Sequence, residues 1–133
     1  MASQIQIVVS KLGGFTAQAA AELARIITKN LDEDTPEDTT FAKTNWVPKI
    51  GSPFSGTAGE KTGRRTANID LAPQTSGLSS LSKYRLNRAP IFVVNNAPYI
   101  LRLNDGHSDQ APKMFIQMSI ARSVREAGKL RGR

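Results

Sequence analysis

The stretch IFVVNNAPYILRLNDGHSDQAP, residues 91–112, decides how this chain folds. Its first four residues, Ile91–Val94, are all apolar, so both faces of a strand formed here need cover. We therefore predict a strand in the centre of a sheet. The remainder of the stretch is polar and rich in turn-forming residues, which excludes an ordinary core element.

Turn-forming residues also define the segment after this strand. Asn95 and Asn96 are expected to close the strand. Pro98 is tolerated at the first position of a short helix that continues to Asn104. Gly106 is the expected end of that helix, because glycine adopts the left-handed conformation without strain.

A strand and a long helix are predicted at the start of the chain. The segment 5–9 places Ile5, Ile7 and Val9 on one face of a short strand. From Phe15 to about Asp32 apolar residues recur at three- and four-residue steps, which predicts a helix with one stripe against a sheet. Pro36 then prevents the helix from continuing.

The middle of the chain alternates short elements with a long loop. Residues 44–50 are predicted to form a strand anchored by Trp46, and Pro48 places this strand at a sheet edge or at a bulge. Residues 51–66 are glycine-rich and lack apolar periodicity, which is typical of a functional or mobile arm. Beyond it, Ile69 and Leu71 indicate a brief strand or a partner contact, and Leu78 with Leu81 a short helix.

The last element is a helix that is expected to open near Pro112 and to end at Gly128. Residues 129–133 are expected to be frayed. Helical spacing predicts that one face of the helix lies against the core: Met114, Met118, Ala121 and Val124.

The order of these elements predicts an α+β fold in a single domain, residues 1–128. It consists of a small, largely antiparallel sheet with a long N-terminal helix and a C-terminal helix packed on it. At 133 residues the chain is long enough to bury a core while leaving surface for partners.

Composition limits the classes of function. The chain has no cysteine, which excludes disulfides and thiolate metal sites. The first ten residues do not resemble a signal peptide. No apolar run approaches the roughly 20 residues of a membrane helix, so no membrane partner is expected. The formal net charge of +7 favours anionic partners such as nucleic acid or acidic protein surfaces.

The charges are unevenly distributed along the sequence. Five acids fall within residues 32–38, among them Asp32, Glu33 and Asp34, whereas the C-terminal region is basic and includes Arg122 and Arg125. Such polarity suits head-to-tail contact between copies, although two solvated surfaces explain it equally simply.

No motif predicts catalysis, a cofactor or a metal. His107, the one histidine, stands beside Ser108 and Asp109, but sequence neighbours cannot aim three side chains in series as a catalytic triad requires. The acidic residues lack the spacing of a calcium loop. The glycine-rich segment 56–62 fails as a phosphate loop, because Glu60 stands where the motif needs glycine. We therefore expect neither an enzyme nor a small-molecule substrate.

Nucleic acid is a more plausible partner. Lys61, Arg64 and Arg65 lie in the glycine-rich arm and can contact phosphates without reading sequence. Aromatic residues do not interleave with them, so stacking on single strands is not indicated.

Three blocks of the sequence resemble the neck or tail-completion proteins of tailed bacteriophages. The first, Asp34–Thr39, is similar to the family's "TP-x-DT" turn through Pro36, Asp38 and Thr39. The second is the pair Asn45 and Trp46, similar to its "NW". The third is similar to "NN-x-PYI…L-x-x-G-x-S-x-QAP" through Asn95, Asn96, Pro98, Tyr99, Leu103, Gly106, Ser108, Gln110, Ala111 and Pro112. Thr40 and Lys113 depart from it, since the family often has glycine after "DT" and after "QAP".

The resemblance implies a structural virion protein that is made in the host bacterial cytoplasm. Copies would form a ring, a hexamer or a multiple, at the head–tail junction, joining the connector to the tail terminator or tail tube while double-stranded DNA passes through. The charges suggest two hypotheses. In the first, Asp32, Glu33 and Asp34 of one subunit meet either the basic C-terminal region of its neighbour, which includes Arg122 and Arg125, or the neighbour's basic arm. In the second, Lys61, Arg64 and Arg65 face the DNA lumen.

Three alternatives remain open. The first is a tail terminator or minor tail protein of the same particle. The second is a free, non-specific nucleic-acid-binding protein, which predicts strong, salt-sensitive DNA binding by the isolated chain. A hydrolytic role would depend on His107 alone.

Overall fold

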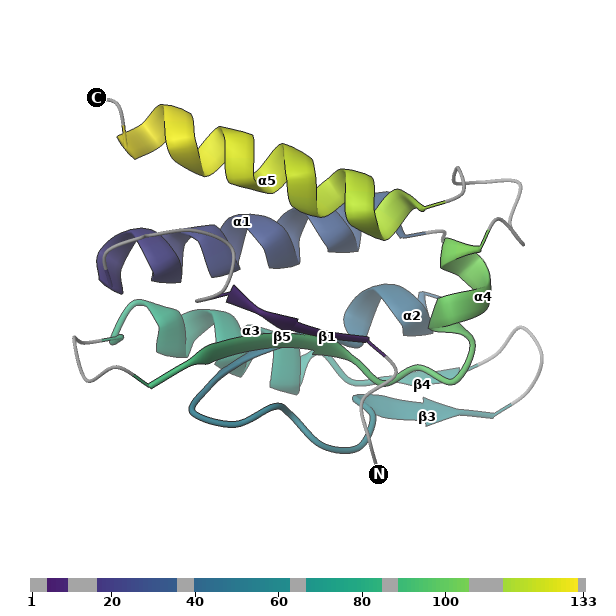
Figure 1. Cartoon of the computed structure of the whole chain (residues 1–133). Coiled ribbons are helices and arrows are strands. Elements are labelled where there is room, and N and C mark those ends of the chain that lie inside the picture. The colour runs from purple at the N-terminus through teal and green to yellow at the C-terminus, as the bar shows by residue number, and fades with distance from the viewer. Residues whose placement is uncertain are drawn as a thin grey trace.

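The computed structural model describes residues 5–9, 17–35, 40–62, 67–84, 89–105 and 114–131. The elements, in chain order, are β1 (Ile5–Val8), α1 (Ala17–Asp34), α2 (Phe41–Thr44), β2 (Trp46–Ile50), β3 (Gly59–Lys61), β4 (Ala67–Ile69), α3 (Ala72–Leu81), β5 (Ile91–Asn95), α4 (Ile100–Asn104) and α5 (Phe115–Arg131). Figure 1 shows their arrangement, with the sheet on one side of the long helices. The α+β fold predicted from the sequence is confirmed.

The main sheet has the strand order β1-β5-β2, and both pairings are antiparallel. β5 is therefore central, as its apolar sequence predicted. Val93 lies opposite Ile7 on one side and Pro48 on the other. Both Val93 and Val94 are fully buried although they point to opposite faces of the sheet, so this strand is covered on both sides.

Helix α3 covers the outer edge of β2. The side chain of Gln74 donates to the backbone oxygen of Trp46 at 3.1 Å, and Gly77 lies against the carbonyl of Pro48. Because Pro48 has no N–H, it suits a position that does not donate to the neighbouring strand. The predicted edge position of β2 is confirmed, and the helix protects that edge from pairing with another chain.

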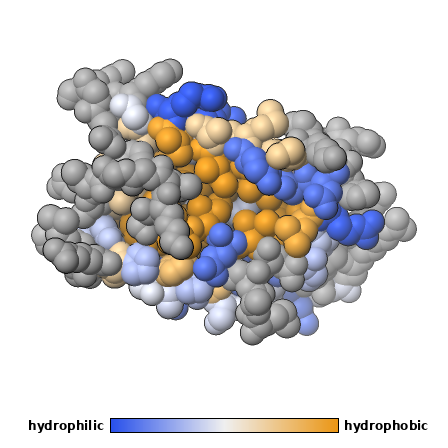
Figure 2. Space-filling model, in the orientation of Figure 1, coloured by the Kyte–Doolittle hydropathy of each residue, from blue (hydrophilic) through white to orange (hydrophobic). Residues whose placement is uncertain are grey.

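The two long helices lie on one side of the sheet. In Figure 1, α1 lies over the sheet and α5 lies over α1. Leu23, Ile27 and Leu31 are fully buried, which confirms the apolar stripe predicted for the first helix. Phe115 and Ile116 bring the first turn of α5 into the core. In the same orientation, Figure 2 shows apolar residues gathered across the middle of the molecule.

The prediction for the core-facing side of the last helix was wrong for three of its four residues, and Val124 alone lies partly buried against the core. Met114 and Met118 are 49% and 57% exposed, and Ala121 is also exposed. The buried positions of α5 are instead Phe115, Ile116, Ser119, Ser123 and Ala127. Two of these residues are serines, which hydrophobic periodicity cannot detect.

The end predicted for that helix was also wrong. The helix passes Gly128 and reaches Arg131, so part of the segment 129–133 is helical. Glycine inside a helix costs about 1 kcal/mol relative to alanine, which a long packed helix tolerates.

The predicted loop 51–66 contains a strand that the sequence did not indicate. β3 pairs with β4 in a separate antiparallel sheet, with Gly59 opposite Ile69 and Lys61 opposite Ala67. Gly59 has φ +83, and a Cβ at this position would overlap the carbonyl of Asn68. Glycine is therefore required both by its backbone conformation and by the close approach of β4.

Candidate functional site

Four of the residues that carry the phage resemblance lie where β2 and β5 meet α2, namely Asn45, Trp46, Asn95 and Asn96. Asn95 is fully buried at the end of β5; its Nδ2 donates to the carbonyl of Ala42 at 2.8 Å, and its Oδ1 accepts from the backbone N–H of Ala97 at 2.9 Å. One side chain thus joins α2 to the turn that follows β5. Both the nitrogen and the oxygen of the side-chain amide thus have hydrogen-bond partners, as a buried asparagine requires.

Asn45, which directly follows α2, has a similar role. Its Nδ2 donates to the carbonyl of Phe41 at 2.8 Å and its Oδ1 accepts from the backbone N–H of Ala58 at 2.8 Å. Asn45 therefore fixes the end of the loop that leads into β3. This side chain is also buried, with 1% exposure.

Asn96 holds the middle of the same loop. Its Nδ2 donates to the carbonyl of Phe54 at 3.0 Å and to that of Gly56 at 2.7 Å. Together with Asn45, it positions residues 54–58 against the sheet. These asparagines replace backbone pairing, because a loop has few partners of its own for its carbonyl groups.

Trp46 connects β2 to the end of α1. Its indole Nε1 donates to Thr35 Oγ1 at 2.8 Å, and that hydroxyl donates to the carbonyl of Leu31 at 2.6 Å. Trp46 is fully buried. The adjacent motif residues Pro36, Asp38 and Thr39 lie outside the described residues.

The remaining described motif residues occupy the segment around α4. Leu103 is buried, Tyr99 is partly buried against the core, and Pro98 is exposed in the turn before the helix. Five motif residues of the third block lie outside the described residues, namely Gly106, Ser108, Gln110, Ala111 and Pro112, as does the neighbouring His107.

Three of the five charged residues assigned to a subunit contact, Asp32, Asp34 and Arg122, interact within one chain. Arg122 Nη2 lies 3.0 Å from Asp34 Oδ2, and Arg122 Nε lies 3.4 Å from Glu126 Oε1. Asp32 accepts from Gln74 Nε2 at 3.0 Å and lies 3.8 Å from Lys43 Nζ.

Two of the five residues assigned to that contact, Glu33 and Arg125, are exposed. The uneven charge along the sequence is therefore partly neutralised when α5 packs beside α1, and Asp34 and Arg122 do not need a neighbouring subunit to find an opposite charge.

The residues assigned to the DNA lumen are only partly described. Lys61 is the last residue of β3, and Arg64 and Arg65 lie outside the described residues, between β3 and β4 in sequence. The hairpin lies away from α1 and α5 in Figure 1.

Shallow grooves on the described surface include one beside β2 and one beside α1. One, of about 420 Å³, lies between β2, α3 and Phe54 and is mainly apolar, with Lys49 as its charged residue. The other, of about 300 Å³, lies between α1 and α3 and contains Asp32 and Gln74, which already bond to each other. Within the described ranges no three acidic or histidine side chains gather where they could hold a metal ion.

Sequence reasoning missed three polar residues that hold the fold. Gln74 of α3 bonds to the backbone of β2. Asn30 of α1 donates to Ser123 Oγ of α5 at 3.0 Å. Asn104 accepts at its Oδ1 from the backbone N–H of Ile116 at 2.9 Å, and its backbone oxygen accepts from the N–H of Met114. Each lacked a local signal, because its partner lies far away along the chain.

Comparison of the chain with protein-family models, with curated proteins and with solved structures finds no match. Among the helices that the structure describes, none is long and apolar enough to cross a membrane.

Proposed function

We propose that this protein is a structural subunit of a tailed-phage virion. It forms a ring at the head–tail junction, as a neck or tail-completion protein, and joins the connector to the tail while DNA passes through. It is made in the host bacterial cytoplasm, acts through shape and self-association, and uses no cofactor and no substrate.

The observation that carries the proposal is the use of the motif asparagines. Asn45 and Asn95 are buried, and the side-chain nitrogen and oxygen of each form hydrogen bonds with backbone groups. Trp46 is likewise buried and bonded. Side chains used in this way position backbone and offer no free group to a substrate, which is what a subunit defined by its shape requires.

The overall charge agrees with a position around DNA. A net charge of +7 favours contact with the phosphate backbone, and such contact needs no sequence recognition. This support is weaker than the first, because a free nucleic-acid-binding protein has the same charge.

Three measurements test the proposal. Cryo-electron microscopy of the particle neck should show density for this fold in a ring between connector and tail; density at the end of the tail tube would instead favour the tail-terminator alternative.

Mass photometry of the purified full chain should show ring-sized species, and a separate binding measurement should show weak DNA binding. If the chain is strictly monomeric and binds DNA tightly at low salt, with an affinity that falls steeply as salt is added, the nucleic-acid alternative replaces the proposal.

A further inference from the structure

Large apolar side chains are exposed in two separate places on the described surface. Leu101, Met114 and Met118 are 44%, 49% and 57% exposed, and they lie on α4 and at the start of α5. Ile69 and Leu71 are 41% and 55% exposed, and they flank Asp70 at the end of β4. No other large apolar side chain among the described residues is classed as exposed, so the two groups are distinct features of this surface.

The two methionines of the first group belong to a stripe along the outer side of α5. Met118, Ala121 and Arg125 follow one another at steps of three and four residues, so they share one face of α5. Met114 precedes the helix and stands four residues before Met118, and all four residues are exposed. We call these four residues the α5 stripe. Its periodicity is that of a packed helix face, yet α1 occupies the opposite side of α5.

The start of this stripe is held in place. The backbone N–H of Met114 donates to the carbonyl of Asn104 at 2.6 Å, and Met114 has φ +63, a conformation that residues other than glycine rarely adopt. Strained positions that the surrounding structure enforces concentrate at functional sites. Methionine also adapts its shape to a partner more readily than branched side chains do.

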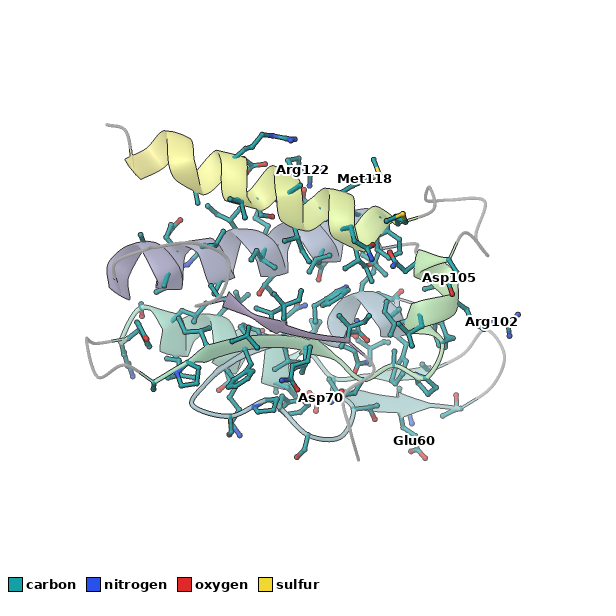
Figure 3. The ribbon with its side chains drawn as sticks, in the orientation of Figure 1. Glu60, Asp70, Arg102, Asp105, Met118 and Arg122 are labelled. Atoms are coloured by element: carbon teal, nitrogen blue, oxygen red, sulfur yellow. The ribbon has the colours of Figure 1, made fainter. Side chains whose placement is uncertain are left out.

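The charged residues near the second group are acidic, whereas most of those near the first group are basic. Asp70 lies between Ile69 and Leu71 in the chain, and Glu60 lies opposite Asn68 on the paired strand β3. Glu60, Ile69, Asp70 and Leu71 are all exposed, and we call these four residues the acidic patch. On the first side, Arg125 and Arg102 are exposed, with Asp105 as the accompanying acid. Figure 3 shows Met118 and Arg122 on one side of the molecule, and Glu60 and Asp70 on the opposite side.

From this arrangement we propose that the α5 stripe of one copy packs on the acidic patch of the next. The exposed methionines meet Ile69 and Leu71, and Arg125 meets Glu60 or Asp70. Two different surfaces of one subunit make a heterologous contact, and such a contact generates a ring when the rotation between neighbouring copies closes. The inference rests on the proposed function, since it names the contact by which the ring forms.

Mixing two variants tests the contact directly. Met118→Lys damages the stripe, and the double change Glu60→Arg with Asp70→Arg damages the patch. All three residues are exposed, so the fold should persist, which circular dichroism of each variant checks. Each variant alone should lose ring-sized species in mass photometry, with association weakened at least about tenfold.

An equimolar mixture of the two variants should form heterodimers and nothing larger. Each such pair retains one intact stripe and one intact patch, which a heterologous contact can use once. Glu22→Lys, an exposed change on α1, is the control and should assemble like the unchanged chain.

The outcomes separate this inference from the proposed function. If the unchanged chain forms rings and both variants still form them, the stripe-to-patch contact is overturned and the ring proposal stays intact. If both variants lose rings but their mixture forms no heterodimers, the contact is also overturned. A head-to-tail interface requires that the intact stripe of one variant binds the intact patch of the other. An unchanged chain that stays monomeric at every concentration overturns both.

Discussion

The indole Nε1 of Trp46 donates to the hydroxyl of Thr35, 2.8 Å away, and that hydroxyl donates in turn to the carbonyl of Leu31. The two residues belong to different layers, since Thr35 follows the last residue of α1 and Trp46 begins β2. A short chain of hydrogen bonds therefore sets the distance between helix and sheet. Both side chains are buried, so water cannot replace a lost partner.

Thr35→Val removes the acceptor but keeps the shape of the side chain. The Trp46 N–H is then buried without a partner, and we expect the free energy of unfolding to fall by about 1–3 kcal/mol. Urea unfolding measures the change. Thr35→Ser keeps the hydroxyl and is the matched control; equal losses in the two variants would show that the hydrogen bond is not the cause.

Gly59, the first residue of β3, and Gly56, in the loop before it, offer a matched pair. Both have positive φ, +83 and +78, but a Cβ overlaps Asn68 only at Gly59 and meets open space at Gly56. Gly56→Ala should cost about 1 kcal/mol from backbone strain alone. Gly59→Ala should cost clearly more and should speed amide exchange in β3 and β4. Similar stability of the two variants would contradict the close approach of these strands.

A second matched pair has opposite expected signs. Gly77→Ala places a Cβ on the carbonyl of Pro48 and should push α3 away from β2, lowering the melting temperature. Gly128→Ala meets nothing within 4 Å in helix α5 and should raise stability by about 0.5–1 kcal/mol. Differential scanning calorimetry compares the two variants. If both substitutions raise the melting temperature, the position of α3 does not depend on the close contact between Gly77 and Pro48.

The sequence predicted those elements in which the chemistry of the residues alone determines burial or position in the sheet. Ile91–Val94 is apolar on both faces, so a central strand was the consistent solution. Pro48 lacks an N–H, and β2 does lie at an edge. The burial of Leu23, Ile27 and Leu31 followed from helical spacing.

The sequence could not predict contacts made by polar residues with distant partners. The buried side of α5 depends on Ser119, Ser123 and the Asn30 amide of α1, so apolar spacing pointed to Met114 and Met118 instead. Asn95 was singled out by its motif, but its acceptor at Ala42 lies 53 positions away. Such pairs form only after the layers have assembled.

Asn95→Asp should make stability depend on pH. The buried carboxylate cannot donate to Ala42 and loses its hydration, so burial raises the pKa of the new acid in the folded state. A raised folded pKa means that the stability is present at low pH and is lost as the pH rises through that pKa. The loss relative to the unchanged chain should therefore be smaller near about pH 4 than at neutral pH. Asn68→Asp, at an exposed position, is the control and should show little pH dependence.

The pair of Asp34 and Arg122 should contribute little to stability. The two side chains are 28% and 40% exposed, so solvent weakens their 3.0 Å contact, and a double-mutant cycle should give a coupling of about 0–1 kcal/mol that falls with added salt. Reversing Asp34 to Lys should leave ring formation largely intact, because its partner lies in the same chain. Loss of rings in that variant, with an unchanged melting temperature, would return Asp34 to the contact between subunits.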